Sequence, residues 1–314
     1  MTLLSTWAKA CLGAACASAL LVGPLPREQQ TARAADRETV PVGIDAEEIR
    51  APRSVQAGKV LFAVRSKDGR PHMLEVFQPR DGVSVREALE GVQNTALLRR
   101  VKGIPVANPP NQVAQAVRET DQITEFFGGA LVDRHHSVRW SATLCPGTYY
   151  LIDLEQILFG EKRWRELEVT GSAEGCDGRE GRASGDRGET SVELVATDDG
   201  PRIRTRTKLP AQGVLSFTNR LPEGGGELLL QRLRRGVTPE DVSDAMAVVL
   251  RGELPTETIV DGQPFGLGGL SAHRNVKLHL DSRPGRYLLF SAVPDPRTGL
   301  PQTRLGAWRV VTLG

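Results

Sequence analysis

The stretch PGTYYLI at residues 146–152 recurs as PGRYLLF at residues 284–290. In both places a Pro-Gly turn leads directly into a run of aromatic and aliphatic residues, a pattern typical of a turn followed by a buried strand. The repetition within one chain, at a separation of about 140 residues, predicts two copies of one structural unit.

The repeat extends toward the N-terminus of each stretch in the same order. VLFAV at residues 60–64 aligns with VLSFT at residues 214–218, and MLEVF at residues 73–77 aligns with LLLQRL at residues 228–233. These short apolar runs are separated by polar turns. We therefore expect two strands at the start of each unit.

A short helix is predicted after the second strand of each unit. GVS at residues 82–84 and GVT at residues 236–238 each end in a good N-cap residue, and Glu87 and Asp241 follow three positions later. This spacing is that of a capping box. The expected helices cover residues 84–91 and 238–250.

The later strands also repeat. RHHSVRW at residues 134–140 aligns with AHRNVKL at residues 272–278, and in both the apolar residues alternate with polar ones, which is the period of a half-buried strand. Final strands are expected at residues 164–169 and 308–313. Short strands with frequent turns and one inserted helix predict an antiparallel β-sandwich for each unit.

A polar, glycine-rich stretch at residues 171–190 lies between the two units and is predicted to be a linker, because it contains too little apolar surface to bury a core. The expected organisation is a polar lead segment at 35–48, a first sandwich at 49–170 and a second sandwich at 191–314.

The second unit resembles the cupredoxin (blue-copper-like) family, and the first unit resembles it more weakly. The order of the parts carries the resemblance: a strand ending in Asn219, a Gly-Val-Thr helix start, a Gly-Gly-Leu-Ser turn at residues 268–271, and Pro-Gly-x-Tyr before a strand. The resemblance implies an all-β fold of two tandem cupredoxin-like Greek-key β-sandwich domains, each with a short inserted helix.

The same resemblance implies a copper site made by two histidines, one cysteine and a weak axial methionine, a ligand set suited to copper. In the second unit the matching positions hold Gly226-Glu227, Ser291, Gln302 and Gly306-Ala307. All four ligands are replaced. We therefore expect the outline of the family without its copper chemistry.

The first unit retains one histidine of that pattern. His72 stands where the first histidine ligand belongs, Asp153 stands at the cysteine position, and residues 156–168 provide neither a histidine nor a methionine. His72, His135 and His136 are weak candidates for a metal site of altered type. The alternative for His135, His136 and the equivalent His273 is a role in a turn of the fold, and His279 is expected to face solvent.

The N-terminus indicates export. Lys9 precedes an apolar run of about 14 residues, from Ala10 to Gly23, which fits the core of a signal peptide but is too short to span a bilayer. Ala32-Arg33-Ala34 provides the small residues of a cleavage site, so we place the cut near Ala34. A lipoprotein signal at Cys16 and an uncleaved anchor remain alternatives.

The leader also accounts for the net charge of +2. Of the 40 Lys and Arg and the 38 Asp and Glu of the whole chain, it holds three basic residues and one acidic residue, which leaves 37 of each in residues 35–314. A neutral mature chain has no net positive field to attract nucleic acid or anionic lipid.

Two cysteines, Cys145 and Cys176, remain after the leader is removed. In an exported domain a pair of cysteines is typically a disulfide. A Cys145–Cys176 bridge would tie the linker back to the first sandwich. The alternative is two free thiols.

One segment of the first unit has no counterpart in the second. It lies within residues 102–133, contains several prolines, and includes Phe126-Phe127-Gly128-Gly129, which we interpret as an apolar loop tip and a candidate contact surface. Packing beneath the loop is the alternative for Phe126 and Phe127. GLGG at residues 266–269 is interpreted as a β-turn.

The chain contains no hydrolase, zinc-protease or phosphate-binding motif, so no catalytic residue and no cofactor is predicted. The sequence favours an exported, non-enzymatic binding or structural module of the cell envelope or exterior. Its expected partner is a protein, a glycan or an envelope component, with no transmembrane segment in the mature chain. The alternatives are a copper-binding or redox protein with an altered, histidine-based site, and a hydrolase on a sandwich scaffold, which the motif search does not support. Ser271 follows Gly-Gly-Leu, but no acid–histidine pair is placed near it in the sequence.

Overall fold

The computed structural model describes residues 38–99, 110–157, 164–172, 190–253 and 255–314. The leader with its cleavage site near Ala34, most of the linker at 171–190, and Cys176 lie outside the described residues. The Cys145–Cys176 disulfide therefore stays a prediction.

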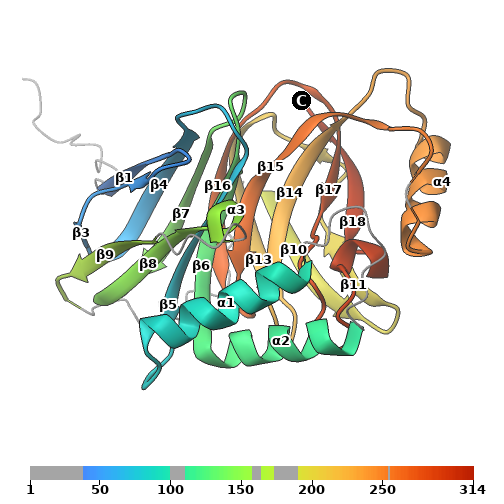
Figure 1. The fold of residues 1–314 in the computed structure, drawn as a ribbon. Coiled ribbons are helices and arrows are strands. Elements are labelled where there is room, and N and C mark those ends of the chain that lie inside the picture. The colour runs from blue at the N-terminus through green and yellow to red at the C-terminus, as the bar shows by residue number, and fades with distance from the viewer. Residues whose placement is uncertain (1–37, 100–109, 158–163, 173–189, 254) are drawn as a thin grey trace, which may run out of the picture. The chain divides into compact units, whose positions relative to one another are not determined.

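The strands of the described residues form two sheets that face each other (Figure 1). One sheet has eight strands in the order β11-β10-β13-β16-β7-β4-β1-β2, and the other has ten in the order β12-β18-β17-β14-β15-β6-β5-β8-β9-β3. The strands of the first half are β1 (Glu38–Ile44), β2 (Ile49–Arg50), β3 (Ser54–Gln56), β4 (Gly58–Ser66), β5 (His72–Pro79), β6 (Thr124–Val132), β7 (Val138–Leu144), β8 (Gly147–Asp153) and β9 (Trp164–Thr170). Those of the second half are β10 (Thr190–Thr197), β11 (Gly200–Arg204), β12 (Lys208–Leu209), β13 (Gln212–Arg220), β14 (Gly226–Leu233), β15 (Val260–Leu270), β16 (Asn275–Asp281), β17 (Gly285–Phe290) and β18 (Trp308–Leu313).

The strand order of each sheet is symmetric. When each strand of the second half is replaced by its equivalent in the first half, the order is the same from either edge of the sheet. In each half the first strand pairs in parallel with the fourth, β1 with β4 and β10 with β13, and the remaining central pairs are antiparallel. The predicted all-β fold class, a β-sandwich built from two tandem copies of one unit, is confirmed.

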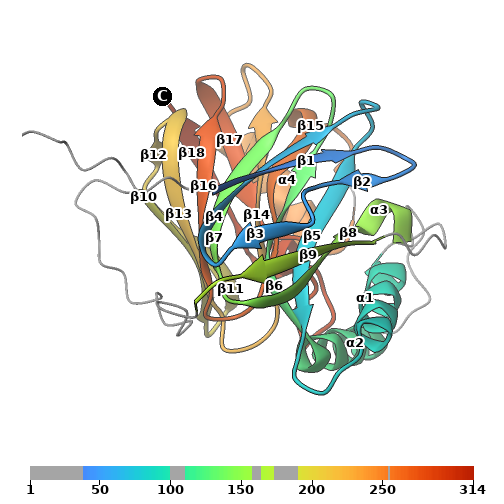
Figure 2. The ribbon, with the colours of Figure 1, turned by 90° about the vertical axis from the view of Figure 1, so that its left-hand side faces the viewer.

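The helices lie outside the sheets. They are α1 (Val85–Arg99), α2 (Pro110–Ile123), α3 (Leu154–Ile157) and α4 (Pro239–Leu250), with one 3-10 turn, η1 (Gln302–Leu305). Helices α1 and α2 lie side by side at one end of the sandwich (Figures 1 and 2). The capping box of Thr238 and Asp241 is present at α4, and the Ser84 hydroxyl accepts from the Glu87 amide at the start of α1.

The Pro-Gly-x-Tyr repeat forms the same corner in both halves. The Tyr149 hydroxyl accepts a hydrogen bond from the Cys145 amide at 3.0 Å, and the Tyr287 hydroxyl donates to the Arg283 carbonyl at 3.0 Å. Both tyrosines are buried. Each ring fills the core while its hydroxyl fixes the turn four residues earlier, because a buried tyrosine hydroxyl needs a hydrogen-bond partner.

Residues 35–48 are not only a polar lead. They contain β1, whose Val40, Val42 and Ile44 are buried in the core. These three residues lie two positions apart, so they share one face of the strand. Its place in the sandwich is fixed by parallel pairing with β4.

The segment within residues 102–133 is also different from the expected loop. Helix α2 begins at Pro110, a residue that fits the first turn of a helix because its missing amide has no helical partner there. Phe126 and Phe127 then lie in β6 and form no exposed contact loop: Phe127 is 3% exposed, and Phe126 packs against the buried cluster that joins Phe77 of β5 to Leu89 of α1. The sequence indicated a loop because proline is rare inside helices and glycine is rare inside strands.

The two halves join edge to edge in both sheets. Strand β6 pairs with β15, with Leu270 opposite Phe127, and β7 pairs with β16, with Leu278 opposite Trp140. The GLGG sequence at 266–269, interpreted above as a turn, lies inside β15 at this junction. One hydrophobic core cluster includes buried residues of both halves.

Glycines at this junction make room for a buried carboxylate. Glu75 of β5 is 2% exposed, and its Oε2 accepts a hydrogen bond from the Gly269 amide of β15 at 2.7 Å. A Cβ at Gly129 would lie 2.1 Å from the Leu74 carbonyl oxygen, and one at Gly268 would lie 2.7 Å from Glu75 Oε2. Only glycine permits so close an approach.

Contacts between side chains reinforce the same junction. The Arg274 guanidinium lies 2.8 Å from the Glu125 carboxylate and 3.8 Å from the centre of the Phe127 ring. Ser271 exchanges hydrogen bonds with the backbone of Phe126, accepting from its amide at 2.9 Å. Ser271 thus links β15 to the backbone of β6.

Among the described helices none is long and apolar enough to cross a membrane.

Gly129→Ala should destabilise the protein because the new methyl group overlaps the Leu74 carbonyl and the Glu75 carboxylate. We expect a loss of about 1–3 kcal/mol in the free energy of unfolding, measured by urea denaturation. Gly225→Ala is the control, since its nearest neighbour outside the adjoining residues, a Val293 methyl, would lie at an ordinary 3.6 Å. Equal effects of the two substitutions would contradict the proposed role of Gly129.

Candidate functional site

The four residues at the copper-ligand positions of the second half were predicted from the resemblance, and the structure brings three of them together. Glu227 lies in β14, Ser291 follows β17, and Gln302 opens η1. All three are buried, at 1%, 0% and 0% exposure. The fourth, Ala307, is also buried and its amide donates to the Gln302 carbonyl oxygen.

These buried polar groups bond to one another and to the backbone. The Ser291 hydroxyl donates to Gln302 Oε1 at 2.7 Å and accepts from the Glu227 amide at 3.2 Å. Gln302 Nε2 donates to the Gly225 carbonyl at 2.8 Å, and Glu227 Oε1 accepts from the Ala292 amide at 2.7 Å. The network ties β14, β17 and η1 together at one end of the second sandwich.

Helices from both halves cover the loops that carry this network. The backbone at Pro110, the start of α2, lies so close to Gly299 that a Cβ there would be 1.8 Å from the Pro110 carbonyl oxygen. Arg118 of α2 donates to the Pro296 carbonyl oxygen, and α4 packs against η1. The loop between Ser291 and Gln302 is therefore held between the extra helices of the fold.

The equivalent place in the first half holds a buried histidine between two carboxylates. His72 is 1% exposed; its Nδ1 lies 2.6 Å from Asp153 Oδ2, and its Nε2 lies 2.9 Å from Asp68 Oδ1. Asp153 also accepts from the amides of Met73 and Glu155. His72 and Asp153 were placed at ligand positions by the sequence, while Asp68 was not singled out.

The surroundings of His72 alter the charges of the cluster. Burial alone would lower the pKa of His72, but hydrogen bonds and charge attraction from Asp153 and Asp68 outweigh it, and the pKa is raised above its usual value of 6.5. Burial opposes ionisation of Asp68, yet hydrogen bonds from His72 and the Arg70 amide lower its pKa to about 2. Both shifts favour an imidazolium that bridges two carboxylates.

The residues at neither position fit a copper site. The second half offers a serine hydroxyl, an amide and a carboxylate where the family has thiolate and imidazole, and copper of this type prefers the soft set. In the first half both nitrogens of the one imidazole already engage carboxylates. Within the described ranges no group of three or more His, Cys, Asp or Glu is arranged to hold a metal ion.

His135 and His136 lie on the turn between β6 and β7. His136 stacks on Phe265 with ring centres 4.4 Å apart, and its Nδ1 lies 2.9 Å from Asp133. His135 Nε2 accepts from Arg134. His273 stands apart from them at the turn after β15, and the half-buried His279 contacts Ser141 across the β7–β16 junction. The turn role proposed for His136 has a visible cause in its bond to Asp133.

A wide cleft, which the sequence did not indicate, lies beside His136 where the two halves meet. Its volume is about 680 Å³. The walls come from turns and strand ends of both halves, among them Gly69 and Pro71, 133–136, 261–263 and 281–283. Phe265 and Tyr287 contribute aromatic rings, and the lining holds three arginines and three aspartates: Arg134, Arg232, Arg283, Asp133, Asp261 and Asp281.

Comparison with known proteins gives fold neighbours only. No protein-family model matches the chain, and no curated protein matches it in sequence. Among solved structures, auracyanin A, a blue copper protein from Chloroflexus aurantiacus, is 15% identical, covering 42% of this chain and 98% of its own, with a TM-score of 0.29.

Larger copper proteins match most of the chain. A copper nitrite reductase from Nitrosomonas europaea is 9% identical, covering 88% of this chain and 93% of its own, with a TM-score of 0.22. A variant of the McoA multicopper oxidase from Aquifex aeolicus is 9% identical, covering 89% and 66%, with a TM-score of 0.24. Likenesses at these scores carry no argument about copper, activity or partners; the fold class rests on the strand pairings above.

Stability should depend on pH through the His72 cluster. Because the pKa of His72 is raised in the folded state, its contribution is fully present below the unfolded value of 6.5 and is lost as pH rises through the folded value. Because the pKa of Asp68 is lowered to about 2, its contribution is present above the unfolded value of 3.8 and is lost as pH falls toward 2. The cluster is therefore most stabilising between these unfolded values.

The variant that tests this pH dependence is His72→Gln. We expect it to lower the free energy of unfolding by about 1–3 kcal/mol near pH 5.5, since it removes buried hydrogen bonds to charged groups. The free energy of unfolding should also fall less above pH 6.5 in this variant than in the parent, as measured by denaturation at a series of pH values. His135→Gln, at an exposed position of the β6–β7 turn, should retain that decline. An unchanged pH profile in His72→Gln would contradict the assignment.

Proposed function

We propose that this chain is an exported, non-enzymatic binding module, in which polar contacts have replaced the copper site of a cupredoxin-like fold. The observation that carries the proposal is the network of Glu227, Ser291 and Gln302, buried where copper ligands would stand and bonded to one another. A fold can persist after its site has changed, since function depends on the site rather than the scaffold. The leader sequence supports export.

The cleft between the halves is the binding surface that we assign to this module. Its volume of about 680 Å³ is within the range of ligand sites, roughly 300–1,000 Å³. His136, stacked flat on Phe265, provides a firm ring surface with a polar edge. Around it, arginine side chains supply hydrogen-bond donors, aspartate side chains supply acceptors, and the glutamine side chain supplies both.

We infer that the ligand is a neutral glycan. The equal numbers of arginines and aspartates in the cleft give it no net charge to select a strongly anionic or cationic ligand. A sugar ring presents many hydroxyl groups, each able to donate and accept, together with apolar faces. The mixed lining of charged pairs and rings satisfies both features.

The alternative function is a copper-binding or redox protein with a histidine-based site. The adjacent imidazoles of His135 and His136, with ring centres 6.3 Å apart beside the cleft, are the observation in its favour. The bonds of these rings to Arg134 and Asp133 count against it, because ligand nitrogens have to be available to the metal.

Copper titration decides between the two functions. The purified protein is mixed with Cu(I) or Cu(II), and bound metal, visible absorption and melting temperature are recorded together. We expect no stoichiometric copper, no intense visible band and an unchanged melt, because a ligand specific to the native state would raise the melting temperature. One tightly bound copper per chain with a raised melt would establish the alternative, and His135→Ala with His136→Ala would then locate it.

Glycan binding tests the assigned cleft. Neutral oligosaccharides are titrated against the protein by calorimetry, with His136→Ala and Gln263→Ala as cleft variants and Arg86→Ala, exposed on α1, as the control. We expect the cleft variants to weaken binding about tenfold or more, equivalent to about 1.4 kcal/mol, and the control to bind as the parent does. Binding that is equal in all four proteins, or absent for every oligosaccharide, would overturn the assignment of a glycan to the cleft.

A further inference from the structure

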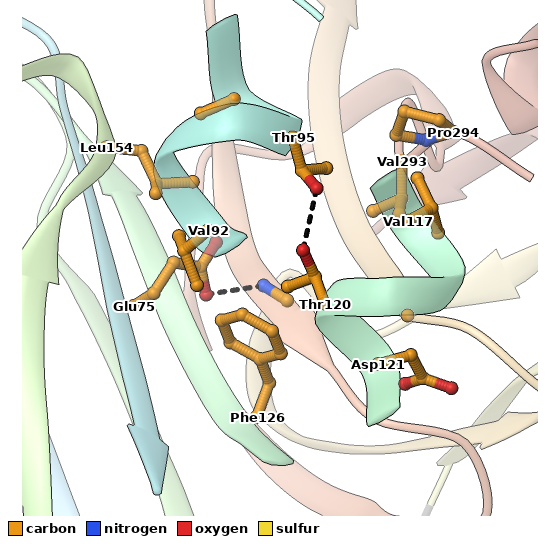
Figure 3. A pocket seen from close by; sticks show the side chains of 13 residues that line it. Glu75, Val92, Thr95, Val117, Thr120, Asp121, Phe126, Leu154, Val293 and Pro294 are labelled. Carbon is orange, nitrogen blue, oxygen red and sulfur yellow. Dashed lines mark hydrogen bonds between the residues drawn. The ribbon is translucent and has the colours of Figure 1, made fainter. Parts of the chain in front are cut away.

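A second, smaller cavity lies beneath helices α1 and α2, away from the cleft residues. Its volume is about 80 Å³. Figure 3 shows that side chains from both helices and from the sheet surround it. Its apolar lining includes Val92, Ala96, Val117, Phe126, Leu154 and Val293. Because Val293 belongs to the second half, this cavity is also shared between the halves.

The threonines of the wall bond across the helix pair. The hydroxyl of Thr95 on α1 lies 2.8 Å from that of Thr120 on α2 (Figure 3). The Thr95 hydroxyl also lies 3.1 Å from the Ala116 carbonyl oxygen of α2, and the Thr120 hydroxyl lies 2.9 Å from the Gly91 carbonyl oxygen of α1. Both hydroxyl protons thus have acceptors within the protein, and these bonds hold the two helices at a set distance.

The carboxylates of the wall bond to the backbone of the second half. Glu75 Oε2 accepts from the Gly269 amide at 2.7 Å, and Asp121 Oδ2 accepts from the Gly224 amide at 3.2 Å. A buried water needs about two to four polar partners. Because the polar side chains of the wall are directed toward protein groups, the space among the apolar side chains favours an apolar occupant over water.

The wall from the second half is held in place by a buried glutamine. Gln302, 0% exposed, donates from Nε2 to the Gly225 carbonyl oxygen at 2.8 Å and from its backbone amide to the Val293 carbonyl oxygen at 2.9 Å. Gly225 and Val293 both line the cavity. The cavity is therefore preformed on this side as well, so a ligand would have few groups to order on binding.

We propose that this cavity binds an uncharged alkyl group of about three carbon atoms, carried by a small molecule. An engineered apolar cavity of about 150 Å³ in another protein admits benzene, and this cavity has roughly half that volume. Transfer of the alkyl group from water into the apolar lining is favourable, whereas a charged group would lose its hydration on entry. This ligand is separate from the glycan assigned to the cleft and does not depend on it.

The experiment compares 1-propanol, n-propylamine and benzene on the purified chain at pH 7 by NMR of the methyl groups. We expect 1-propanol to shift the signals of Val92, Val117 and Leu154, which line the cavity, and to leave that of Val310 on β18 unchanged. The charged amine and the larger benzene should bind at least tenfold more weakly. Equal or tighter binding of either one, or no shift with 1-propanol, would overturn the proposal.

Variants of the lining test the location and the size limit. Ala96→Leu fills the cavity from α1 and should abolish binding of 1-propanol. Val92→Ala enlarges the cavity and should bind benzene at least tenfold more tightly than the parent does. Val249→Ala, which removes the same atoms on α4 outside this cavity, is the matched control and should bind as the parent does.

Binding of 1-propanol that survives in Ala96→Leu would place the ligand elsewhere and contradict the proposal, as would equal benzene binding in the two valine variants. If either lining variant does not fold, the comparison of the three probes on the unaltered protein decides by itself.

Discussion

The Glu75 carboxylate crosses from β5 over β6 to the backbone of β15, and this contact sets how closely the two halves approach. Gly129 and Gly268 leave the space that the carboxylate occupies, since a methyl group at either position would overlap its neighbours. Strands β6 and β15 can then pair, and β7 pairs with β16 in the facing sheet. Two sandwiches thereby share both sheets and one hydrophobic core.

This shared construction explains where the hollows of the molecule lie. The cleft beside His136 and the cavity beneath α1 and α2 both take walls from the first and the second half. The cleft is wide and lined by balanced charges, while the cavity is small, apolar and acidic. Each half alone would supply only part of either lining, so both hollows exist only because the halves are joined.

The two clusters at the positions matched to copper ligands by the resemblance have different compositions. In the second half, the Ser291 hydroxyl donates to Gln302, Gln302 donates to a backbone carbonyl, and the Glu227 carboxylate accepts from a backbone amide, so these buried polar groups have partners. In the first half, His72 lies between two carboxylates. It connects β5 to Asp153 at the end of β8 and to Asp68 in the turn before β5. Both clusters occupy strand ends that the fold brings together.

The sequence by itself determined the repeat, the central strands and the capped starts of α1 and α4, because these depend on local periodicity and turn chemistry. It also placed His72, Asp153, Glu227, Ser291 and Gln302 at equivalent positions, since their order along the chain follows the order of the strands. It failed for β1, α2, β6 and β15, where glycine and proline have two readings and only the packing partner selects one.

Only the tertiary structure decided that Phe126 and Phe127 are packed rather than exposed, and that Asp68 completes the His72 cluster. It alone showed that Glu75 spans the junction and that two hollows lie between the halves. These features join residues far apart in the chain, 194 positions apart for Glu75 and Gly269. No local pattern encodes such a contact, because its energy depends on distances that exist only after both sheets have formed.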